Sequence, residues 1–517
     1  MHSEIYLDAN ATSTVLPAAV DAALAALTDT FGNPSSSHGA GLRARRLLDD
    51  TRACARRVLG AGSGRLAFTS GATEGIQTAV LSALCAVRER RAAGLPCGDL
   101  LLYGATEHKA VPESLVHWNR VLGTGLRLQA LPVDGDGRHR LDLLRALAPH
   151  TAFLCTMAAN NESGVVSDMD GIAAVLEETG SPALWMVDCV QALGKLPLAL
   201  NRTRIDYAPF SGHKLHAPKG IGMLYVREGA PYTALVCGGG QEAGQRSGTE
   251  NMAGIAALGA VLHALEEGGT FRSHAELAAC RDRLAAALRA AFPAIEFNAP
   301  LEHALPTTLN FSVPGLSGKE LLDLFDAAGV RVSAGSACSA AAAAPSHVLQ
   351  AMGLPDARCA HAVRMSFGPL VDDAFIAQAC ARIAHCGRAL AASPAIACAE
   401  APWPACAPAE GDYDSGCIAI DAAGLAQFLA QHPGALLIDV REAHEHAAGT
   451  PTLHGRAAYN LPLSRLAGHA NWLRAETRPL VFFCRSGNRS ARAAQLAQGL
   501  GHPAVRHLAG GLALFSG

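Results

Sequence analysis

Hydrophobic residues along roughly the first 260 positions form short runs, and stretches with a helical spacing of apolar residues separate these runs. Residues 66–69 (LAFT) and 184–187 (LWMV) are two such runs, and continuous apolar runs of this kind are typical of strands covered on both faces. Between 76 and 87, apolar residues recur every three or four positions, which predicts a helix. The alternation predicts an α/β fold whose sheet has helices on both faces.

Beyond about residue 260 the pattern becomes less regular. A helical pattern over 276–291 is followed by a strand-like run at 308–313 (TLNFSV), which favours a smaller α+β domain. We therefore expect a large domain at about 15–260 and a small domain built from 1–14 and 261–390.

A segment rich in proline separates this region from the end of the chain. Residues 393–416 contain four prolines, a run of alanines and several acidic residues. Prolines at this density prevent a regular helix, so we predict a linker over 391–412. Apolar runs return at 435–440 (ALLIDV) and 479–483 (PLVFF). They predict buried strands of a small α/β domain over 413–517.

Composition and charge exclude some classes of function. A chain of 517 residues exceeds the usual size of a single core, so two or three domains are expected. With 50% hydrophobic residues, 17% charged residues and a net charge of −3, the chain has no basic excess that would bind nucleic acid or anionic lipid. The first residues (MHSE) lack the features of a signal peptide, and no apolar stretch is long enough to span a membrane.

The fifteen cysteines are scattered along the chain and form no Cys-x-x-Cys pair. The sequence therefore predicts neither a disulfide framework nor a metal site. Reduced thiols without an export signal indicate a cytoplasmic protein.

Three residues, each in a short segment of its own, carry side chains that could take part in one reaction. Lys214 ends the segment FSGHK, and a buried lysine can form a Schiff base with an aldehyde cofactor. Asp188 lies in VDCVQ, and an aspartate beside a pyridinium nitrogen keeps that nitrogen protonated, which makes the ring an electron sink. Cys338 ends GSAC, where a thiol can act as a nucleophile. Together they indicate pyridoxal phosphate chemistry directed at a sulfur atom.

A candidate phosphate site lies at residues 69–74 (TSGATE), between a predicted strand and a predicted helix. Gly71 permits a tight turn, and the free backbone N–H groups of a helix start attract phosphate. An ordinary turn capped by Thr73 is the alternative.

Residues 1 to about 390 resemble cysteine desulfurases of the class V aminotransferase family. The stretches that carry the resemblance follow in order: 6–12 (YLDANAT), 31–38 (FGNPSSSH), 69–74 (TSGATE), 106–109 (TEHK), 160–164 (NNESG), 210–214 (FSGHK), 246–251 (RSGTEN) and 335–338 (GSAC). The resemblance implies the fold type I of pyridoxal phosphate-dependent transferases, with pyridoxal 5'-phosphate as cofactor and L-cysteine as substrate.

The resemblance also implies a role for individual residues. Lys214 would form the Schiff base, His108 would stack on the pyridine ring and assist proton transfer, and Cys338 would keep the substrate sulfur as a persulfide. Arg364 would clamp the substrate carboxylate, which suits a planar guanidinium, together with Asn161. The further cofactor contacts that it implies are Ala72, Thr73, Asp188, Gln191, Ser211 and His213.

A homodimer is implied as well. In it, residues 246–249 would reach the partner's site and Thr249 would touch the partner's cofactor phosphate. Ala243 departs from the family, which usually has a basic residue there, so a role for this position is not expected. Residues 339–344 are almost all alanine, and we expect a mobile loop that helps Cys338 to deliver sulfur.

The C-terminal region contains a second sulfur site. Residues 482–490 (FFCRSGNRS) run from a predicted strand into a predicted helix, so backbone N–H groups around Cys484, together with Arg485 and Arg489, are expected to stabilise an anionic sulfur. Residues 413–517 resemble a single rhodanese domain through LIDVRE, NLPL, this loop and HLAGG, with an irregular departure at 450–458. The implied persulfide loop consists of Cys484, Arg485, Ser486, Gly487, Asn488 and Arg489.

The sequence thus predicts an L-cysteine desulfurase fused to a rhodanese-type sulfurtransferase, in which sulfur passes from Cys338 to Cys484 and then to acceptor proteins or small thiols. A selenocysteine lyase or a transaminase remains an alternative for the first part, although a transaminase needs no thiol nucleophile. A non-catalytic docking module is the alternative for the second part. The final acceptor, such as an iron–sulfur scaffold, remains open, as do the roles of Cys398, Cys406 and Cys417.

Overall fold

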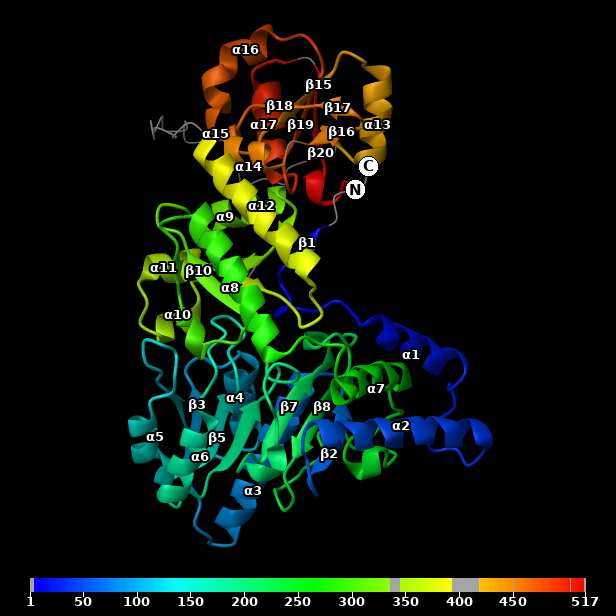
Figure 1. Cartoon of the computed structure of the whole chain (residues 1–517), viewed down its shortest axis with the longest axis vertical. Helices are drawn as coiled ribbons and strands as arrows, with labels where there is room; N and C mark the ends of the chain where they lie inside the picture. The colour runs from blue at the N-terminus through cyan, green and yellow to red at the C-terminus, as the bar shows by residue number, and fades with distance from the viewer. Residues whose placement is uncertain (1–3, 335–344, 393–417, 450, 503, 516–517) are drawn as a thin grey trace.

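Three bodies of secondary structure follow one another along the long axis of the molecule (Figure 1). The computed structural model describes residues 4–334, 345–392, 418–449, 451–502 and 504–515. Figure 1 shows a large sheet with its helices at one end, a smaller sheet in the middle and the C-terminal body at the other end. From residue 393 onward, the predicted linker lies outside the described residues.

The first body is built on a seven-stranded sheet with the order β2-β8-β7-β6-β5-β3-β4. Its strands are β2 (Arg65–Thr69), β3 (Leu100–Gly104), β4 (Arg127–Leu131), β5 (Thr151–Met157), β6 (Leu184–Asp188), β7 (Tyr207–Ser211) and β8 (Gly222–Val226). The strands from β7 to β4 pair in parallel, whereas β8 is antiparallel to both β2 and β7. The α/β fold with strands near 66 and 184 is therefore confirmed.

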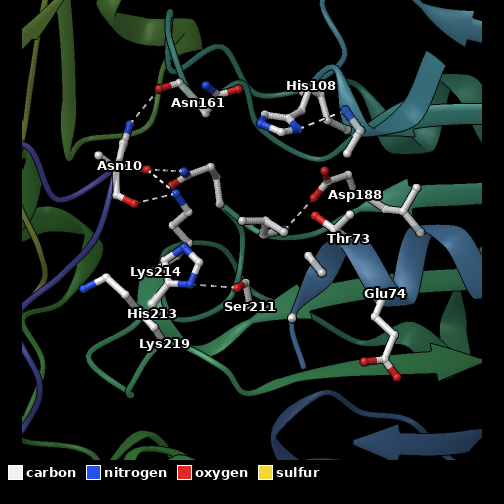
Figure 2. Close-up of a pocket in the computed structure, with 18 of the residues that line it drawn as sticks. Asn10, Thr73, Glu74, His108, Asn161, Asp188, Ser211, His213, Lys214 and Lys219 are labelled. Carbon is white, nitrogen blue, oxygen red and sulfur yellow. Dashed lines mark hydrogen bonds between the residues drawn. The ribbon is translucent and has the colours of Figure 1, made fainter. Parts of the chain in front are cut away.

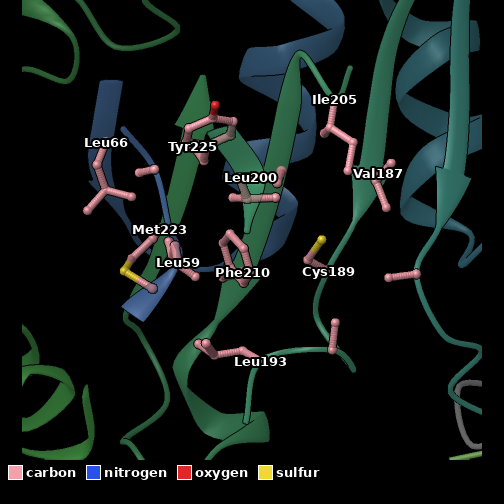
Figure 3. Close-up of a cluster of buried hydrophobic side chains, with 14 of the residues drawn as sticks. Leu59, Leu66, Val187, Cys189, Leu193, Leu200, Ile205, Phe210, Met223 and Tyr225 are labelled. Carbon is pink, nitrogen blue, oxygen red and sulfur yellow. The ribbon is translucent and has the colours of Figure 1, made fainter. Parts of the chain in front are cut away.

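Helices cover both faces of this sheet. The helices are α1 (Pro17–Thr28), α2 (Gly39–Val58), α3 (Ala72–Ala92), α4 (Ala110–Val121), α5 (Leu141–Leu147), α6 (Met169–Glu178) and α7 (Met252–Glu267). Strand β6 shows why its sequence is a continuous apolar run: Trp185 and Val187 enter the core on one face, and Leu184 and Met186 enter the core on the other. Figure 3 shows part of the first core, with Val187 and Phe210 among its side chains.

The middle body contains a four-stranded antiparallel sheet with the order β12-β13-β10-β9. Its strands are β9 (Glu296–Phe297), β10 (Thr308–Ser312), β12 (Ser333–Ala334) and β13 (Val363–Ser366), and beside them β1 (Ile5–Tyr6) pairs with β11 (Val330–Arg331). Its helices are α8 (His274–Ala291), α9 (Gly318–Ala327), α10 (His347–Ala351), α11 (Asp356–His361) and α12 (Asp373–Ala392). The chain start thus joins this body, and the predicted helix and strand at 276–291 and 308–313 are confirmed.

The C-terminal body contains a parallel sheet with the order β14-β20-β19-β15-β18. Its strands are β14 (Ala419–Ile420), β15 (Leu436–Asp439), β18 (Tyr459–Asn460), β19 (Leu480–Phe483) and β20 (Val505–Leu508), with a short hairpin of β16 (Thr452–Leu453) and β17 (Arg456–Ala457). Its helices are α13 (Ala422–Gln431), α14 (Ala443–Ala448), α15 (Leu463–Leu466), α16 (Ala470–Ala475) and α17 (Asn488–Gly499). Phe482 and Phe483 enter the cores on opposite faces of the sheet, which confirms the predicted buried strand.

The C-terminal body packs directly against the middle body. Helix α14 lies against α9 and α12 (Figure 1), and Ala448 belongs to the same buried cluster as the side chains of the middle body. The side chain of His385 on α12 contacts the carbonyl oxygen of Ala448 at 3.1 Å. A Cβ atom on Gly449 would lie 1.9 Å from the carbonyl oxygen of Ala327, so only glycine allows this approach. None of the helices in the described ranges is long and apolar enough to cross a membrane.

Candidate active site

A cavity of about 520 Å³ lies at the carboxyl ends of the central strands of the large sheet (Figure 2). Strand β6 ends at Asp188, β7 ends at Ser211, and Asn161 follows β5. The ends of neighbouring parallel strands meet at one edge of a sheet, which brings these distant segments together. The predicted site residues that line the cavity are Ala72, Thr73, His108, Asn161, Asp188, Gln191, Ser211, His213, Lys214 and Arg364.

Lys214 lies in the wall of the cavity, directly after β7. Its Nζ donates hydrogen bonds to the carbonyl oxygens of Asn10 and Ala11, both at 2.8 Å. The side chain is half-buried rather than fully buried as the sequence suggested, because it borders the open cavity. An amine in this position can be reached by an aldehyde that enters the cavity.

Asp188 is a buried carboxylate on the floor of the cavity. Its Oδ1 accepts a hydrogen bond from the backbone N–H of Val190 at 2.9 Å. Burial raises the pKa of Asp188 to about 6, and the N–H of Val190 and the charge of Lys214 oppose this shift only in part. A cationic ring nitrogen would stabilise the anion of Asp188, so this residue fits the pyridinium end of pyridoxal phosphate.

A phosphate cradle lies at the start of α3. The residue before this helix is Gly71, which has no side chain to cap the first N–H groups, so these groups face the cavity at Ala72 and Thr73. Ser211 Oγ lies 3.1 Å from His213 Nδ1 on the opposite wall. Burial and then the charges of Lys214 and Lys219 lower the pKa of His213 to about 4, so its ring is neutral. These donors fit the phosphate group of the cofactor.

His108 faces the same space from the segment between β3 and α4 (Figure 2). Its Nδ1 accepts a hydrogen bond from the backbone N–H of Ala110 at 3.2 Å. Burial, followed by the positive charge of Lys214, lowers the pKa of His108 below its usual range. A neutral imidazole can stack on an aromatic ring, and because Nδ1 accepts the hydrogen bond of Ala110, Nε2 carries the proton and can donate it into the cavity.

Arg364 on β13 reaches the cavity from the middle body. Its Nη1 donates to the carbonyl oxygen of Asn161 at 2.9 Å, and its Nη2 donates to Asp8 Oδ1 at 2.7 Å. The buried Nε has no hydrogen-bond partner among the described residues. The guanidinium is thus held in place from one side with an N–H still to be satisfied, which fits a substrate carboxylate.

Two residues predicted for the desulfurase site are not among the described residues that line this cavity. Thr249 lines a separate hollow of about 270 Å³, which shares Ser70 and Gly220 with the main cavity. Its contact with a partner's cofactor therefore stays a prediction. Cys338 and the alanine-rich segment 339–344 lie outside the described residues.

Two polar residues of the site were not singled out from the sequence. The carbonyl oxygen of Asn10 accepts hydrogen bonds from both Lys214 Nζ and Gln191 Nε2, and its side chain donates to the carbonyl oxygen of Asn161 at 3.2 Å. The buried Lys195 donates to Gln191 Oε1 at 2.7 Å and to Asn10 Oδ1 at 3.4 Å. Lys195 therefore fixes the orientation of the Gln191 side-chain amide, because it donates to the oxygen of that amide. The spacing of four residues from Gln191 was the only sequence signal for it.

A second site lies in the C-terminal body, in the loop between β19 and α17. Cys484 has 1% of its surface exposed, and its Sγ accepts a hydrogen bond from the backbone N–H of Gly487 at 3.2 Å. Ser490 Oγ lies 3.6 Å from the sulfur, whereas Ser486 and Asn488 are exposed. One backbone N–H of the predicted ring, that of Gly487, thus bonds the sulfur just before the start of α17.

The two arginines of this loop differ from the expectation, because both are paired with carboxylates instead of facing the sulfur alone. Arg489 donates to both oxygens of the buried Glu445, at 2.6 and 2.8 Å. Arg485 reaches across to α9 of the middle body, where it pairs with Asp323 at 2.8 Å and Asp326 at 3.0 Å. Local sequence could not reveal these partners, since α9 lies about 160 residues away along the chain.

A group of possible metal ligands that does not line the main cavity consists of Cys54, His263 and Glu266. Glu266 accepts hydrogen bonds from Arg57 at 2.5 and 2.9 Å. Burial, followed by the charge of Glu266, raises the pKa of Cys54 to about 12. A protonated thiol and a carboxylate held by arginine do not favour a cation there.

Comparison with known proteins agrees with both sites. The family description Aminotransferase class-V matches residues 5–376, and the description Rhodanese-like domain matches residues 422–517. A cysteine desulfurase of Cereibacter sphaeroides is 40% identical over 365 residues, which cover 70% of this chain and 90% of that protein. The cysteine desulfurase NifS of Azotobacter vinelandii is 36% identical over 368 residues, which cover 70% and 88%.

Solved structures give the same result. A NifS-like protein superposes with a TM-score of 0.66 at 31% identity, covering 75% of this chain and all of that one. The DndA protein of Streptomyces lividans superposes with a TM-score of 0.57 at 32% identity, covering 70% and 99%. These matches confirm the resemblance that the sequence motifs indicated. The chain belongs to the class-V aminotransferase family of pyridoxal phosphate-dependent enzymes and continues into a rhodanese-like domain.

Proposed function

We propose that this protein is an L-cysteine desulfurase that forms a persulfide on Cys338 and passes the sulfur to Cys484 of its own rhodanese-like domain. The observation that carries the proposal is the convergence of Lys214, Asp188, His108 and Arg364 on one cavity. The printed names of the relatives, which are cysteine desulfurases, support the choice of substrate.

In this proposal the residues of the cavity hold the substrate and move its protons. Pyridoxal phosphate, when bound, would withdraw electrons from the α-carbon of the amino acid, which weakens the bond between the β-carbon and sulfur. Arg364 binds the carboxylate from its place in the cavity lining, and Lys214 removes and returns protons from its position beside the floor of the cavity. Asn10, Gln191 and Lys195 keep the polar wall in a single arrangement.

Sulfur leaves the substrate by attack of the Cys338 thiolate. The new bond joins the two sulfur atoms, the carbon–sulfur bond breaks, and the β-carbon takes up a proton to become the methyl group of alanine. The thiolate of Cys484 then attacks the outer sulfur of the Cys338 persulfide, and Cys338 leaves as a thiolate. This second step is an exchange between thiols and needs no added oxidant or reductant.

Tethering favours the exchange over reaction with free carriers. A flexible chain as long as the predicted linker would span roughly 25 Å on average, and linkers of this kind commonly give effective concentrations of about a millimolar. The homodimer in which Thr249 reaches the partner's cavity belongs to the same proposal, and sedimentation equilibrium would test it.

The hand-over is tested with L-cysteine that carries labelled sulfur. After a short reaction, the wild type and Cys338→Ser are digested without reduction, and the label is located by mass spectrometry. We expect label on Cys338 and Cys484 in the wild type and on neither in the variant. A fully labelled Cys338 beside an unlabelled Cys484 would contradict the hand-over, and label on neither cysteine would contradict the desulfurase.

A further inference from the structure

The persulfide loop of the C-terminal body is held against α9 by ion pairs. Helix α9 begins with a capping box between Ser317 and Glu320 and presents Asp323 and Asp326, which are three residues apart and therefore on the same side of the helix. We call these two aspartates the acidic edge of α9. Arg485 pairs with both of them, and Arg489 lies 3.5 Å from Asp323.

Asp323 of the acidic edge is buried, with 4% of its surface exposed. Burial opposes the charged form, but hydrogen bonds from Lys319 and Arg485 outweigh it and lower the pKa of Asp323. Asp323 is therefore an anion inside the interface, and a buried anion requires cations around it. Removal of the loop would take away Arg485 and leave Lys319 as the cation bound to it.

Apolar packing beside the ion pairs adds to the docking. Ala448 enters the hydrophobic cluster of the middle body, and Gly449 follows it against the carbonyl oxygen of Ala327. Ion pairs and close packing thus act on one face, which is the face that carries the loop of Cys484.

The docked loop does not face the cavity of Lys214. Figure 1 shows the C-terminal body on the side of the middle body that points away from the large sheet. Among the described residues, those that line the cavity include none from α9 or from the C-terminal body. In this arrangement Cys484 is 1% exposed and packs in the hydrophobic cluster of the C-terminal body, and the charge of Arg485 is compensated by carboxylates of α9.

We propose that the acidic edge of α9 is a docking surface for the persulfide loop, and that Cys484 exchanges sulfur only after this contact opens. Opening frees Arg485 from Asp323 and Asp326 to stabilise an anionic sulfur, and we expect it to give reagents access to the loop of Cys484. The freed Arg485 fits an acceptor protein with an acidic helix, because such a helix presents carboxylates as α9 does. The role of Cys484 as a sulfur carrier rests on the proposed function, whereas the docking does not.

The test measures how fast iodoacetamide alkylates Cys484 in the holoenzyme, by peptide mass spectrometry. The exposed Cys237 serves as the internal reference in every sample. Two variants open the contact by different means: Asp323→Asn with Asp326→Asn removes the charges, and Gly449→Ala introduces a clash with Ala327. We expect each to increase the rate at Cys484 about tenfold and to leave the rate at Cys237 unchanged.

Matched controls separate docking from general damage. Asp282→Asn changes an exposed aspartate of α8, and Gly468→Ala adds a methyl group where nothing lies within 4 Å, so neither should change the rate at Cys484. Molar sodium chloride should accelerate alkylation of the wild type but not of the charge variant, because salt screens the ion pairs. Hexaglutamate should accelerate wild-type alkylation more than sodium chloride of equal ionic strength.

Several outcomes would overturn the proposal. Equal alkylation rates in the wild type and both opening variants would exclude docking as the barrier, and hexaglutamate acting no better than salt would exclude an acidic acceptor. Sulfur transfer from thiosulfate to cyanide provides the separate readout of the carrier role. If no variant has this activity while alkylation behaves as expected, the function proposed for Cys484 fails and the docking stands.

Discussion

The buried amine of Lys195 should make the stability of the large body depend on pH. Burial, and then the charges of Lys214 and Arg364, lower the pKa of Lys195 from 10.5 to about 7. Each pKa unit corresponds to about 1.36 kcal/mol, so holding the ammonium form in the native state costs on the order of 5 kcal/mol. We chose Lys195→Met because methionine has a similar length and cannot bind a proton.

The sign follows from proton binding. Between pH 7 and about 10, the unfolded chain keeps a proton on Lys195 that the native protein has lost, so the wild type gains stability as the pH rises. The gain is about 1.4 kcal/mol for each pH unit in this window and ends above the pKa of the unfolded state. From pH 8 to 9.5, the wild type should therefore gain about 2 kcal/mol relative to Lys195→Met.

The assay is urea unfolding of the cofactor-free protein, followed by tryptophan fluorescence, to which the fully buried Trp185 contributes. The free energies of unfolding are compared at pH 7, 8 and 9.5 for the wild type, Lys195→Met and the control Lys109→Met. Lys109 is exposed, and its variant should follow the wild type. A constant difference between the wild type and Lys195→Met at all three pH values would refute the reasoning, because it would mean that Lys195 keeps its proton when folded.

Three further predictions concern the reaction. Lys214→Ala should lose the yellow colour of the cofactor-bound enzyme and all release of alanine, since a Schiff base needs an amine; a yellow, active variant would show that another lysine serves. Cys338→Ser should keep the colour of the cofactor but lose sulfide production, and a sulfide assay that finds full activity would contradict the role of Cys338. Cys484→Ser should still release alanine normally when a strong reductant is present. Arg364→Lys should raise KM for L-cysteine about tenfold to a hundredfold with a smaller effect on kcat, because charge-assisted hydrogen bonds contribute about 1.5–3 kcal/mol; an unchanged KM in steady-state kinetics would exclude Arg364 as the carboxylate clamp.

The local sequence determined the elements and most members of the cavity. The run LWMV predicted strand β6 because the side chains of this strand enter cores on both faces of the sheet, which requires an uninterrupted apolar run. The sequence predicted Lys214, Asp188 and the start of α3 as parts of the site, because cofactor chemistry restricts the residue types within short segments. Their convergence also followed from the alternation of strands and helices, since parallel strands place their carboxyl ends on one edge.

The tertiary structure alone decided contacts between segments that are distant in the sequence and similar to ordinary surface residues. Asp323 and Asp326 look like exposed charges of an amphipathic helix, and only the arrival of Arg485 turns them into an interface. Gly449 looks like a loop glycine until the carbonyl of Ala327 lies where its side chain would be. Lys195 looks like a surface lysine until burial lowers its pKa. Periodicity and motifs report on local conformation and on chemistry within a segment, whereas burial and ion pairing depend on which surfaces meet after folding.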